Sequence, residues 1–483
     1  MSDPYKEFID QAEVAGRQIR DGIGKGKQFL VCYHFDADGI AAAGILSKAL
    51  YRKGASFKLR VLRQLDEPSV EFLSKSVAEM LVFADIGSGY LDLLKGLVES
   101  KGIFVLDHHQ INGGAISKLT HVNPHVSGID GGKEISGAGV SYMVAKGIDQ
   151  LNVDLSPLAV VGSVGDMQDK NDKRALQGLN SLLVHDAVQV GLLKIETDLL
   201  IYGRETRPIH KALAHTMNPF LPGLSGEEDN CLALLSSLSI PIKIGDRWRT
   251  VVELTNDEKK MIFSAIVEHI TSKGFAGATV MNLIGSVYTL LQEDKLTPTR
   301  DAREYATLLN ACGRMERPSL AVAICLGERG STMAEATRVL SEHRKTLAKY
   351  ITLISERPET VENLGMLCVI HGGDFLNENM TGAVSSLLSS SETFARDKIV
   401  IVSARTKNGN IKISARATDE MVGKGLNLGL ILQLLSKRHN GMGGGHKMAA
   451  GAEIPNSEWK TFLTDLKHAV EEGVQNAESN HQD

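Results

Sequence analysis

The stretch His34-Phe35-Asp36-Ala37-Asp38-Gly39 decides the fold of the first part of the chain. It follows an apolar run, residues 29–33, that predicts a buried strand, and precedes another, residues 40–46, that predicts a helix. One imidazole and two carboxylates therefore stand where a strand ends, which is where ligands bind in open α/β sheets. Two carboxylates this close repel each other unless a cation lies between them. The stretch is either a metal site or a polar turn in which Asp38 caps the helix, and it lacks the further acidic positions of an EF-hand loop.

The composition is that of a soluble protein with several domains. The 483 residues suggest two to four domains, and a hydrophobic content of 43% supplies their cores. A net charge of -5 gives no overall attraction to nucleic acid or to an anionic membrane, so polyanion binding would need a local patch. The five cysteines are odd in number and form no close metal-ligand pair, which favours a reduced interior. With no signal peptide and no apolar run of about 18 residues, we expect a cytoplasmic protein.

Strand and helix patterns alternate through the first domain. After the first strand, further strands are predicted at 57–62, 80–84 and 102–106, and helices near 3–22, 39–53, 68–78 and 89–100. This alternation predicts a parallel sheet with right-handed crossovers.

Acidic residues follow three of these four strands. Asp36, Asp85 and Asp107 each stand at or just after the end of a predicted parallel strand, and such ends share one edge of the sheet. His108 and His109 come next, and adjacent residues of an extended segment point to opposite sides. We therefore expect one imidazole to bind a metal ion and the other to face the substrate or a supporting partner, with Asp107 fixing a tautomer. An ordinary surface histidine pair is the alternative.

Two later segments carry small residues beside candidate ligands. Residues 136–140, Ser-Gly-Ala-Gly-Val, predict a helix start that either binds an anion through its backbone amides or allows close helix packing. Asp166 follows Gly165, which lets the backbone approach closely.

At this point the residues resemble a known family. Residues 34–39, Ala84-Asp85-Ile86-Gly87, Asp107-His108-His109 and Gly165-Asp166 resemble, in order and spacing, the four motifs of the DHH phosphoesterases. Residues 310–314, Asn-Ala-Cys-Gly-Arg, resemble a signature of RecJ-type exonucleases, and residues 443–451 resemble the glycine-rich motif of the DHHA1 domain. The resemblance covers most of the chain except about residues 200–295. It is strongest to the archaeal RecJ-like group, which includes the GINS-associated nuclease.

The resemblance implies a site for two divalent ions. Mixed carboxylate and imidazole ligands suit manganese better than magnesium, although either ion is possible. One ion would be held by His34, Asp36 and Asp85. The other would be held by Asp38, Asp85, His108 and Asp166, with Asp85 bridging the two ions. The catalytic roles would fall to His109 facing the scissile phosphate, Asp107 behind it, and Arg314 on a phosphate oxygen, unless Arg314 pairs with Glu316 or another acid.

A long extra segment separates Asp166 from Asn310. Its residues 228–238 and 256–292 predict mainly helix. By resemblance, the archaeal group and its catalytically inactive eukaryotic relative in the replicative helicase carry such an insertion, which implies a docking surface, for example for the GINS complex. An insertion without a partner is the alternative. Residues 331–356 predict a long charged helix that connects two lobes.

The last domain offers a cationic hairpin. Asn408-Gly409 predicts a two-residue turn, which would place Arg405 opposite Lys412 and Ser403 opposite Ser414. One face would then carry Ser403, Arg405, Lys412, Ser414 and Arg416, and the other Val400, Val402, Ala404, Ile411, Ile413 and Ala415. From Arg396 to Gly451, ten lysines and arginines stand against three acids. That excess fits binding of a nucleic acid backbone, although an ordinary solvated face is the alternative.

The glycine-rich motif of the same domain offers a second contact with the strand. Gly443, Gly444 and Gly445 would let backbone amides approach a phosphate, and His446 could donate a hydrogen bond.

We therefore predict an α/β enzyme whose second, smaller α/β domain has a mixed sheet. The expected parts are a DHH domain with a parallel sheet at 1–200, a helical insertion at 201–295, a return with the connector helix at 296–345, a DHHA1 domain at 346–470 and a disordered tail at 471–483. We expect it to hydrolyse the ends of single-stranded DNA or RNA to mononucleotides, in DNA replication or repair. The alternatives are a phosphodiesterase of oligoribonucleotides or cyclic dinucleotides, and a replisome scaffold that binds GINS.

Overall fold

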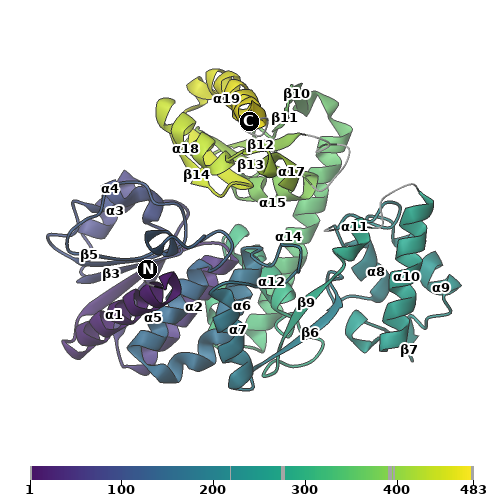
Figure 1. Ribbon diagram of the computed structural model, residues 1–483, viewed down its shortest axis with the longest axis horizontal. Coiled ribbons are helices and arrows are strands. Elements are labelled where there is room, and N and C mark those ends of the chain that lie inside the picture. The colour runs from purple at the N-terminus through teal and green to yellow at the C-terminus, as the bar shows by residue number, and fades with distance from the viewer. Residues whose placement is uncertain (1–2, 218, 274–277, 390–393, 395–397, 480–483) are drawn as a thin grey trace. The chain divides into compact units, whose positions relative to one another are not determined.

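The chain forms two compact units, Met1–Leu340 and Ser341–Asp483 (Figure 1). The computed structural model describes residues 3–217, 219–273, 278–389, 394 and 398–479. Within them, no helix combines the length and the apolar run that crossing a membrane requires. All five cysteines are buried and free.

The first unit is built on a five-stranded parallel sheet with the strand order β2-β1-β3-β4-β5. Its strands are β1 (Gln28–His34), β2 (Ser56–Leu62), β3 (Met80–Ala84), β4 (Gly102–Leu106) and β5 (Leu119–Val122). The predicted parallel α/β sheet is confirmed. Helices before and between these strands are α1 (Pro4–Gly24), α2 (Ala37–Arg52), α3 (Glu67–Ser74) and α4 (Leu91–Leu94). The helix predicted at 89–100 is shorter than expected, since α4 ends before Gly96, a poor helix former.

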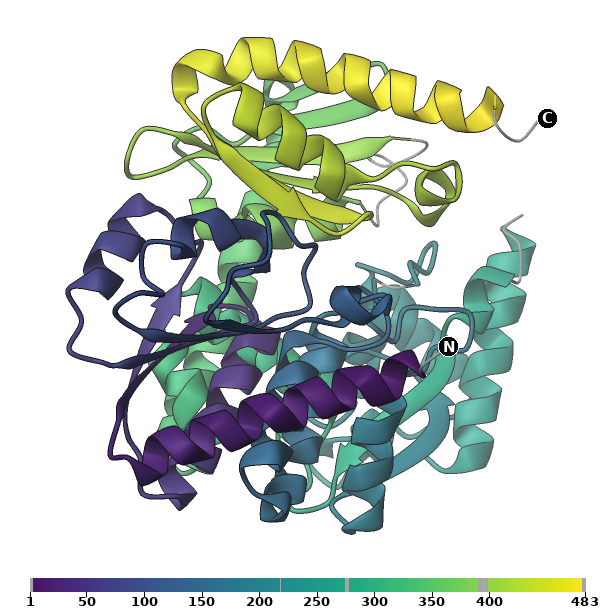
Figure 2. The same cartoon turned by 60° about the vertical axis from the view of Figure 1, so that its left-hand side comes forward.

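Both faces of this sheet are covered because successive side chains of each strand enter different cores. In β1, Val31 packs with α1, α2, α5 (Gly137–Ile148) and α6 (Ser156–Gly165), whereas Cys32 packs with α3 and α4. Helix α1 lies along the first of these faces (Figure 2). Covering both faces leaves the carboxyl ends of the strands, where the candidate ligands stand, as the accessible edge.

After α6, the chain of the first unit runs into an insertion and then returns to pack beside the parallel sheet. A two-stranded antiparallel ribbon, β6 (Leu193–Leu199) and β9 (Ile284–Leu290), frames the insertion. The insertion contains α8 (Ile209–Ala214), α9 (Glu228–Ser237), β7 (Lys243–Ile244), β8 (Arg247–Trp248), α10 (Asn256–Ser272) and α11 (Ala278–Met281), and its helices pack on a core of their own. Helices α7 (Asn180–Gln189), α12 (Ala302–Arg314) and α13 (Pro318–Cys325) complete the unit. The prediction of helix through 292 is wrong, because residues 284–290 alternate in burial and pair with β6.

The second unit is a six-stranded mixed sheet with the order β10-β11-β12-β13-β15-β14. Its strands are β10 (Val361–Leu364), β11 (Leu367–His371), β12 (Ile399–Arg405), β13 (Ile411–Arg416), β14 (Met442–Gly445) and β15 (Ala449–Ile454). Its helices are α15 (Thr381–Leu388), α17 (Asp419–Gly423), α18 (Leu428–Arg438) and α19 (Trp459–Ser479). The long helix predicted at 331–356 is confirmed as α14 (Ser331–Glu356), which runs across the boundary between the units. The predicted mixed-sheet α/β second domain is confirmed.

The hairpin of β12 and β13 has a different register from the one predicted. Arg405 pairs with Ile411, Ala404 with Lys412 and Val402 with Ser414. The reason is a longer loop: Thr406 N–H donates to Asn410 O, and Asn410 N–H donates to Thr406 Oγ1. Asn408-Gly409 is therefore the tip of that loop rather than the whole turn, and the pairing shifts by one residue.

The shifted register redistributes the two faces. Lys412, Ser414 and Arg416 share a face with Val400, Val402 and Ala404, and Ser403 and Arg405 share the other with Ile411, Ile413 and Ala415. Both faces are packed, one beside α15 and the other beside α18 and α19. The prediction of one apolar face and one open cationic face is therefore wrong. Arg396 and Asp397, which entered the charge count, lie outside the described residues.

The chain end is more regular than its composition predicts. Helix α19 continues to Ser479 and so includes most of the segment 471–483, for which a disordered tail is predicted. Its apolar residues Phe462, Leu466 and Val470 are buried in the core, which anchors the helix that these polar residues extend. Residues 480–483 lie outside the described part.

Candidate metal centre

The candidate ligands stand at the carboxyl edge of the parallel sheet. His34 ends β1, Asp85 follows β3, and Asp107 with His108 follows β4. Asp166 comes from the end of α6. Asp85 has a φ of 59°, a left-handed conformation that is costly for a non-glycine residue and typical of functional sites. Segments from four parts of the chain therefore converge as the strand ends predict.

The first group consists of His34, Asp36 and Asp85, whose ligand atoms lie within 4.8 Å of one another. His34 Nδ1 is 3.0 Å from Asp36 Oδ2 and 3.6 Å from Asp85 Oδ2. Asp36 is also the N-cap of α2, since its Oδ1 accepts from Gly39 N–H at 3.0 Å. The capping role expected of Asp38 thus belongs to Asp36. Its Oδ1 caps α2, and its Oδ2 faces His34 in the first group.

The second group consists of Asp38, His108 and Asp166, again within 4.8 Å. His108 is buried, and its Nε2 is 3.6 Å from Asp38 Oδ2 and 3.2 Å from Asp85 Oδ1. Its Nδ1 donates to Gly131 O at 2.7 Å, which leaves Nε2 as the nitrogen suited to bind a metal ion. Asp85 contacts histidines of both groups and therefore lies between them.

Asp38 is bound by the helix start at residues 136–140, for which either anion binding or close packing is expected. Its Oδ2 accepts from Gly137 N–H at 2.6 Å and its Oδ1 from Ala138 N–H at 2.9 Å. The anion at the start of α5 is therefore this carboxylate. A Cβ on Gly137 would lie 2.5 Å from Asp85 Oδ1, so the small residue is also required for close packing. Close helix packing is allowed at Gly139, where a Cβ would lie 3.1 Å from Leu183 Cδ1 of α7.

His109 is supported by Asp107. Its Nδ1 lies 2.7 Å from Asp107 Oδ1, and the other oxygen of Asp107 accepts from Ser88 N–H at 2.8 Å. The rings of His108 and His109 are 4.4 Å apart, because the chain turns after β4 instead of remaining extended. The expectation that they point to opposite sides is therefore wrong, and both rings lie near Asp85 Oδ1, His108 Nε2 at 3.2 Å and His109 Nδ1 at 3.7 Å.

The electrostatics of the cluster reflect carboxylates crowded in a buried place. Burial and the charge of Asp85 raise the pKa of Asp38 well above its usual value. Burial, with Asp85 adding to it, raises the pKa of Asp166 to about 6. Burial alone would lower the pKa of His34, but the carboxylates of Asp36 and Asp85 raise it to about 10. In each case the raised pKa means that the crowded carboxylates favour a bound proton, and hence positive charge, in the cluster.

These residues fit divalent metal ions. Among the described side chains, His34 Nδ1 and Asp85 Oδ1 are buried without a hydrogen-bond partner, and both are good ligand atoms. A cation between the two groups would satisfy them and would relieve the repulsion between the carboxylates.

Asn310 and Gly313 contact the backbone of the His34–Gly39 stretch, a role that the sequence does not predict for them. Asn310 Oδ1 accepts from Ala37 N–H at 2.9 Å, and a Cβ on Gly313 would lie 1.7 Å from Phe35 O. Helix α12 therefore presses against the backbone of the His34–Gly39 stretch. In the sequence, Asn310 and Gly313 both belong to the Asn-Ala-Cys-Gly-Arg signature at 310–314, whose spacing alone does not reveal this contact.

Arg314 is partly buried on the same helix. Burial lowers its pKa, and the charge of Asp36 opposes that effect. Glu316, the alternative ion-pair partner, instead lies 2.5 Å from Arg63. Gly313, the neighbour of Arg314, lies against Phe35 O, so Arg314 stands on the part of α12 that packs on the loop of the first group.

The predicted strand-binding residues belong to the second unit and are not equally available. Arg405 is exposed, with Nε 3.5 Å from Asp374, whereas Ser414 is buried against Thr381. Arg416 donates to Ser386 Oγ, and Lys412 lies opposite Glu453 in the sheet.

The glycine-rich motif lies at the sheet edge. Gly443, Gly444 and Gly445 lie in β14, and His446 N–H donates to Ala449 O at the start of β15. A Cβ on Gly443 would meet Leu432 O of α18 at 2.9 Å, whereas at Gly444 the space is open. Gly443 thus has a packing reason, and Gly444 leaves room for a ligand.

Three family models match the chain. They are the DHH family N-terminal domain at residues 28–162, the DHH-CID domain at 201–284 and the DHHA1 domain at 367–476. Residues 28–162 form a DHH-family domain. An uncharacterized protein of Methanocaldococcus jannaschii is 29% identical over 474 residues, which cover 96% of this chain and 99% of that protein. The predicted family is confirmed, with both its DHH and DHHA1 domains.

Solved structures share this DHH fold. RecJ from Thermus thermophilus, crystallised with Mn2+, has a TM-score of 0.56 and 16% identity, with 96% of this chain covered. The chain spans 55% of that RecJ. CDC45 from Entamoeba histolytica has a TM-score of 0.62 and 12% identity, with 95% of this chain and 99% of the other covered. At these identities the likeness is one of fold.

Proposed function

We propose that this chain is a metal-dependent exonuclease that hydrolyses phosphodiester bonds at the end of single-stranded DNA or RNA and releases mononucleotides. The observation that carries the proposal is the pair of ligand groups that share Asp85. A protein without a catalytic role has no physical reason to keep four carboxylates and two imidazoles so close together. The likeness of fold to RecJ supports the choice of a polymer substrate.

The cofactor proposed is a pair of divalent ions, Mn2+ before Mg2+. His34, Asp36 and Asp85 would hold one ion, and Asp38, Asp85, His108 and Asp166 the other. Such a pair lowers the pKa of a bound water and neutralises charge on the phosphoryl oxygens. The mixture of imidazole and carboxylate ligands favours Mn2+.

The remaining side chains would act on the substrate directly. Because His109 Nδ1 is held by Asp107, its Nε2 is the nitrogen that would contact the scissile phosphate. Arg314, on the side of Asp36, would bind a phosphate oxygen with its guanidinium. No serine, cysteine or threonine nucleophile is needed, since water attacks.

The second unit would hold the strand. Arg405, Lys412 and Arg416 would neutralise backbone phosphates, with Ser414 acting only by supporting the sheet from its buried position. Gly444 and its neighbours Gly443 and Gly445 would offer backbone amides, and His446 a hydrogen bond. We further propose that the insertion binds the GINS complex, which would connect the enzyme with DNA replication or repair.

Digestion of end-labelled DNA and RNA strands tests the proposal. We expect mononucleotide release with Mn2+, loss of activity with a chelator, and loss in Asp36→Ala with an unchanged circular dichroism spectrum. The matched control is Asp92→Ala, an acid on the surface helix α4 outside both groups. Wild-type rates from Asp36→Ala would refute the metal role. Faster hydrolysis of dinucleotides than of long strands would favour the small-substrate phosphodiesterase.

A further inference from the structure

Gln168 is a buried side chain in contact with the metal centre that the proposed chemistry does not use. It is 4% exposed and follows Asp166 by two residues. Its Nε2 lies 2.9 Å from Asp166 Oδ2, 2.9 Å from Gly131 O and 3.2 Å from Ile135 O. All three neighbours are acceptors only, so the amide nitrogen must face them and the amide oxygen must face away.

The other end of the amide is also fixed. Gln168 Oε1 accepts from Asn180 Nδ2 at 2.6 Å, and Asn180 Oδ1 accepts from Ser163 Oγ at 2.8 Å. Asn180 and Ser163 are fully buried. Gln168 is therefore held in one orientation by partners that do not bind metal, which is the arrangement expected of a residue that positions ligands.

These hydrogen bonds reach each member of the second ligand group. Asp166 is bound directly, so one of its oxygens is fixed and the other is left for an ion. His108 is reached through Gly131 O, which accepts from both His108 Nδ1 and Gln168 Nε2. Asp38 is reached through Ile135, since the backbone that follows Ile135 supplies the Gly137 and Ala138 amides that bind its carboxylate.

The first ligand group is supported by other means. Within the described part of the chain, the hydrogen bonds of Gln168 reach none of His34, Asp36 and Asp85. The loop of Asp36 is instead held by Gly39 and, through Ala37, by Asn310. One amide thus organises a single group of three ligands.

We propose that Gln168 is a positioning residue for one of the two ions, the one held by Asp38, His108 and Asp166 together with the shared Asp85. The inference rests on the proposed two-ion function. It predicts an asymmetric effect: removal of the amide weakens one ion site and leaves the other as it was. Loss of a supporting hydrogen bond to a ligand lowers metal affinity by roughly 10- to 100-fold.

Titration of the full-length protein with Mn2+, followed by electron paramagnetic resonance of the free ion, tests this. Gln168→Met keeps the length of the side chain and removes both N–H donors. We expect wild type to bind two ions and Gln168→Met to bind one with unchanged affinity and the other roughly 10- to 100-fold more weakly. Gln168→Asn, which keeps an amide but withdraws it by one methylene, should weaken the same site and serves if Gln168→Met does not fold.

The matched control is Asn152→Leu. Asn152 is also a buried amide, 1% exposed, with hydrogen bonds to Ala145 O and Arg52, and it belongs to neither ligand group. We expect this variant to lower the unfolding temperature and to leave both Mn2+ affinities unchanged. Equal weakening of both sites in Gln168→Met, or no weakening, would overturn the inference. Wild type that binds no Mn2+ would overturn the proposed function itself, and the inference with it.

Discussion

Among single residues, Gly313 shows how closely distant parts of the sequence meet at the metal centre. Its backbone lies so near Phe35 O that an added Cβ would stand 1.7 Å from that oxygen. Phe35 lies between His34 and Asp36, two members of the first ligand group. Any side chain at position 313 must therefore move either α12 or the loop that carries these ligands.

We expect Gly313→Ala to destabilise the chain by about 1–3 kcal/mol, the usual cost of an added methyl group in a packed site. Because a displacement of about 1 Å near reacting groups lowers rates by roughly 100-fold, hydrolysis should fall more than stability suggests. Urea unfolding and the end-labelled strand assay measure the two effects. Gly24→Ala is the control, since a Cβ there has nothing within 4 Å, and it should change neither quantity noticeably. A fully active, fully stable Gly313→Ala would contradict the close approach.

At the level of helices and strands, the residues that meet at the strand ends could be predicted from the sequence. The hydrogen-bond partners of their side chains could not. The convergence of Asp36, Asp85 and Asp107 follows from the regular geometry of parallel strands, which local apolar runs reveal. The partner of Asp38 is the start of α5, about a hundred residues later, and only the packed fold brings them together. The register of β12 and β13 depends on hydrogen bonds between Thr406 and Asn410, which a turn rule based on Asn408-Gly409 overlooks.

The start of α12 carries a buried acid that should make stability depend on pH. Glu304 accepts from Glu205 N–H at 2.6 Å and from Thr206 Oγ1, at the point where the chain enters the insertion. Burial, with the charge of Asp301 adding to it, raises the pKa of Glu304 to about 7 from a usual 4.5. The folded state therefore binds the proton more tightly than the unfolded state does.

The sign of the effect follows from this difference. The stability that Glu304 contributes is fully present below pH 4.5 and is lost as the pH rises through 7, a change of about 3 kcal/mol. Glu304→Gln imitates the protonated form, so we expect it to be more stable than wild type at pH 8 and no more stable at pH 4.5. Urea unfolding at both pH values measures this, and titration of the metal-site carboxylates cancels in the comparison. Glu328→Gln, an exposed control, should show the same small effect at both values. A Glu304→Gln effect that does not vary with pH would contradict the shift.

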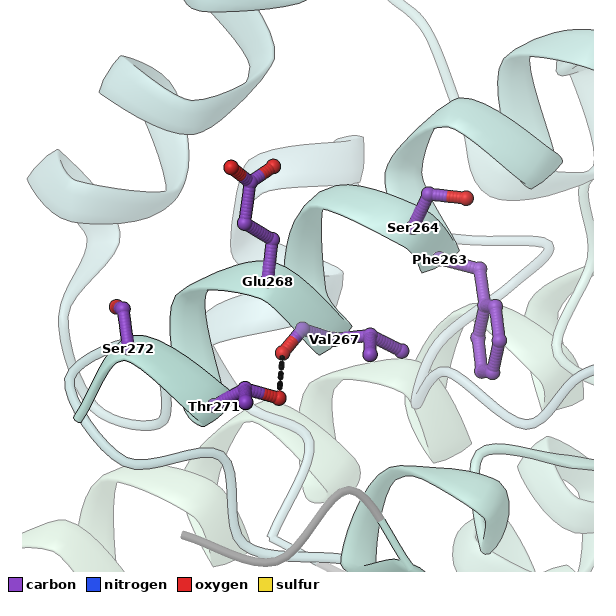
Figure 3. A pocket seen from close by; sticks show the side chains of 6 residues that line it. All are labelled: Phe263, Ser264, Val267, Glu268, Thr271 and Ser272. Carbon is purple, nitrogen blue, oxygen red and sulfur yellow. Dashed lines mark hydrogen bonds between the residues drawn. The ribbon is translucent and has the colours of Figure 1, made fainter. Parts of the chain in front are cut away.

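For the whole molecule, the insertion is the part most easily separated from the metal centre. It has its own hydrophobic core, which includes Ile262, Ile266 and Ile270 of α10. A groove on its surface is lined by six residues of α10, namely Phe263, Ser264, Val267, Glu268, Thr271 and Ser272 (Figure 3). The candidate metal ligands all come from other segments. Partner binding and hydrolysis should therefore be separable by mutation.

The two-stranded ribbon of β6 and β9 that frames the insertion allows the insertion to be removed. Leu199 of β6 pairs with Ile284 of β9, so an Asn-Gly turn joining these two residues could replace everything between them. Asp198 and Glu304 would lose Arg204, Glu205, Thr206 and Lys259 as partners but would gain water, which limits the cost. We expect the shortened chain to bind two Mn2+ ions and to digest single strands at a rate within about threefold of wild type, a difference of less than 1 kcal/mol in the barrier. It should fail to retain purified GINS complex in a pull-down in which the full-length chain retains it. GINS retained equally by both chains would place the docking surface elsewhere, and a full-length chain that does not bind GINS would refute this partner.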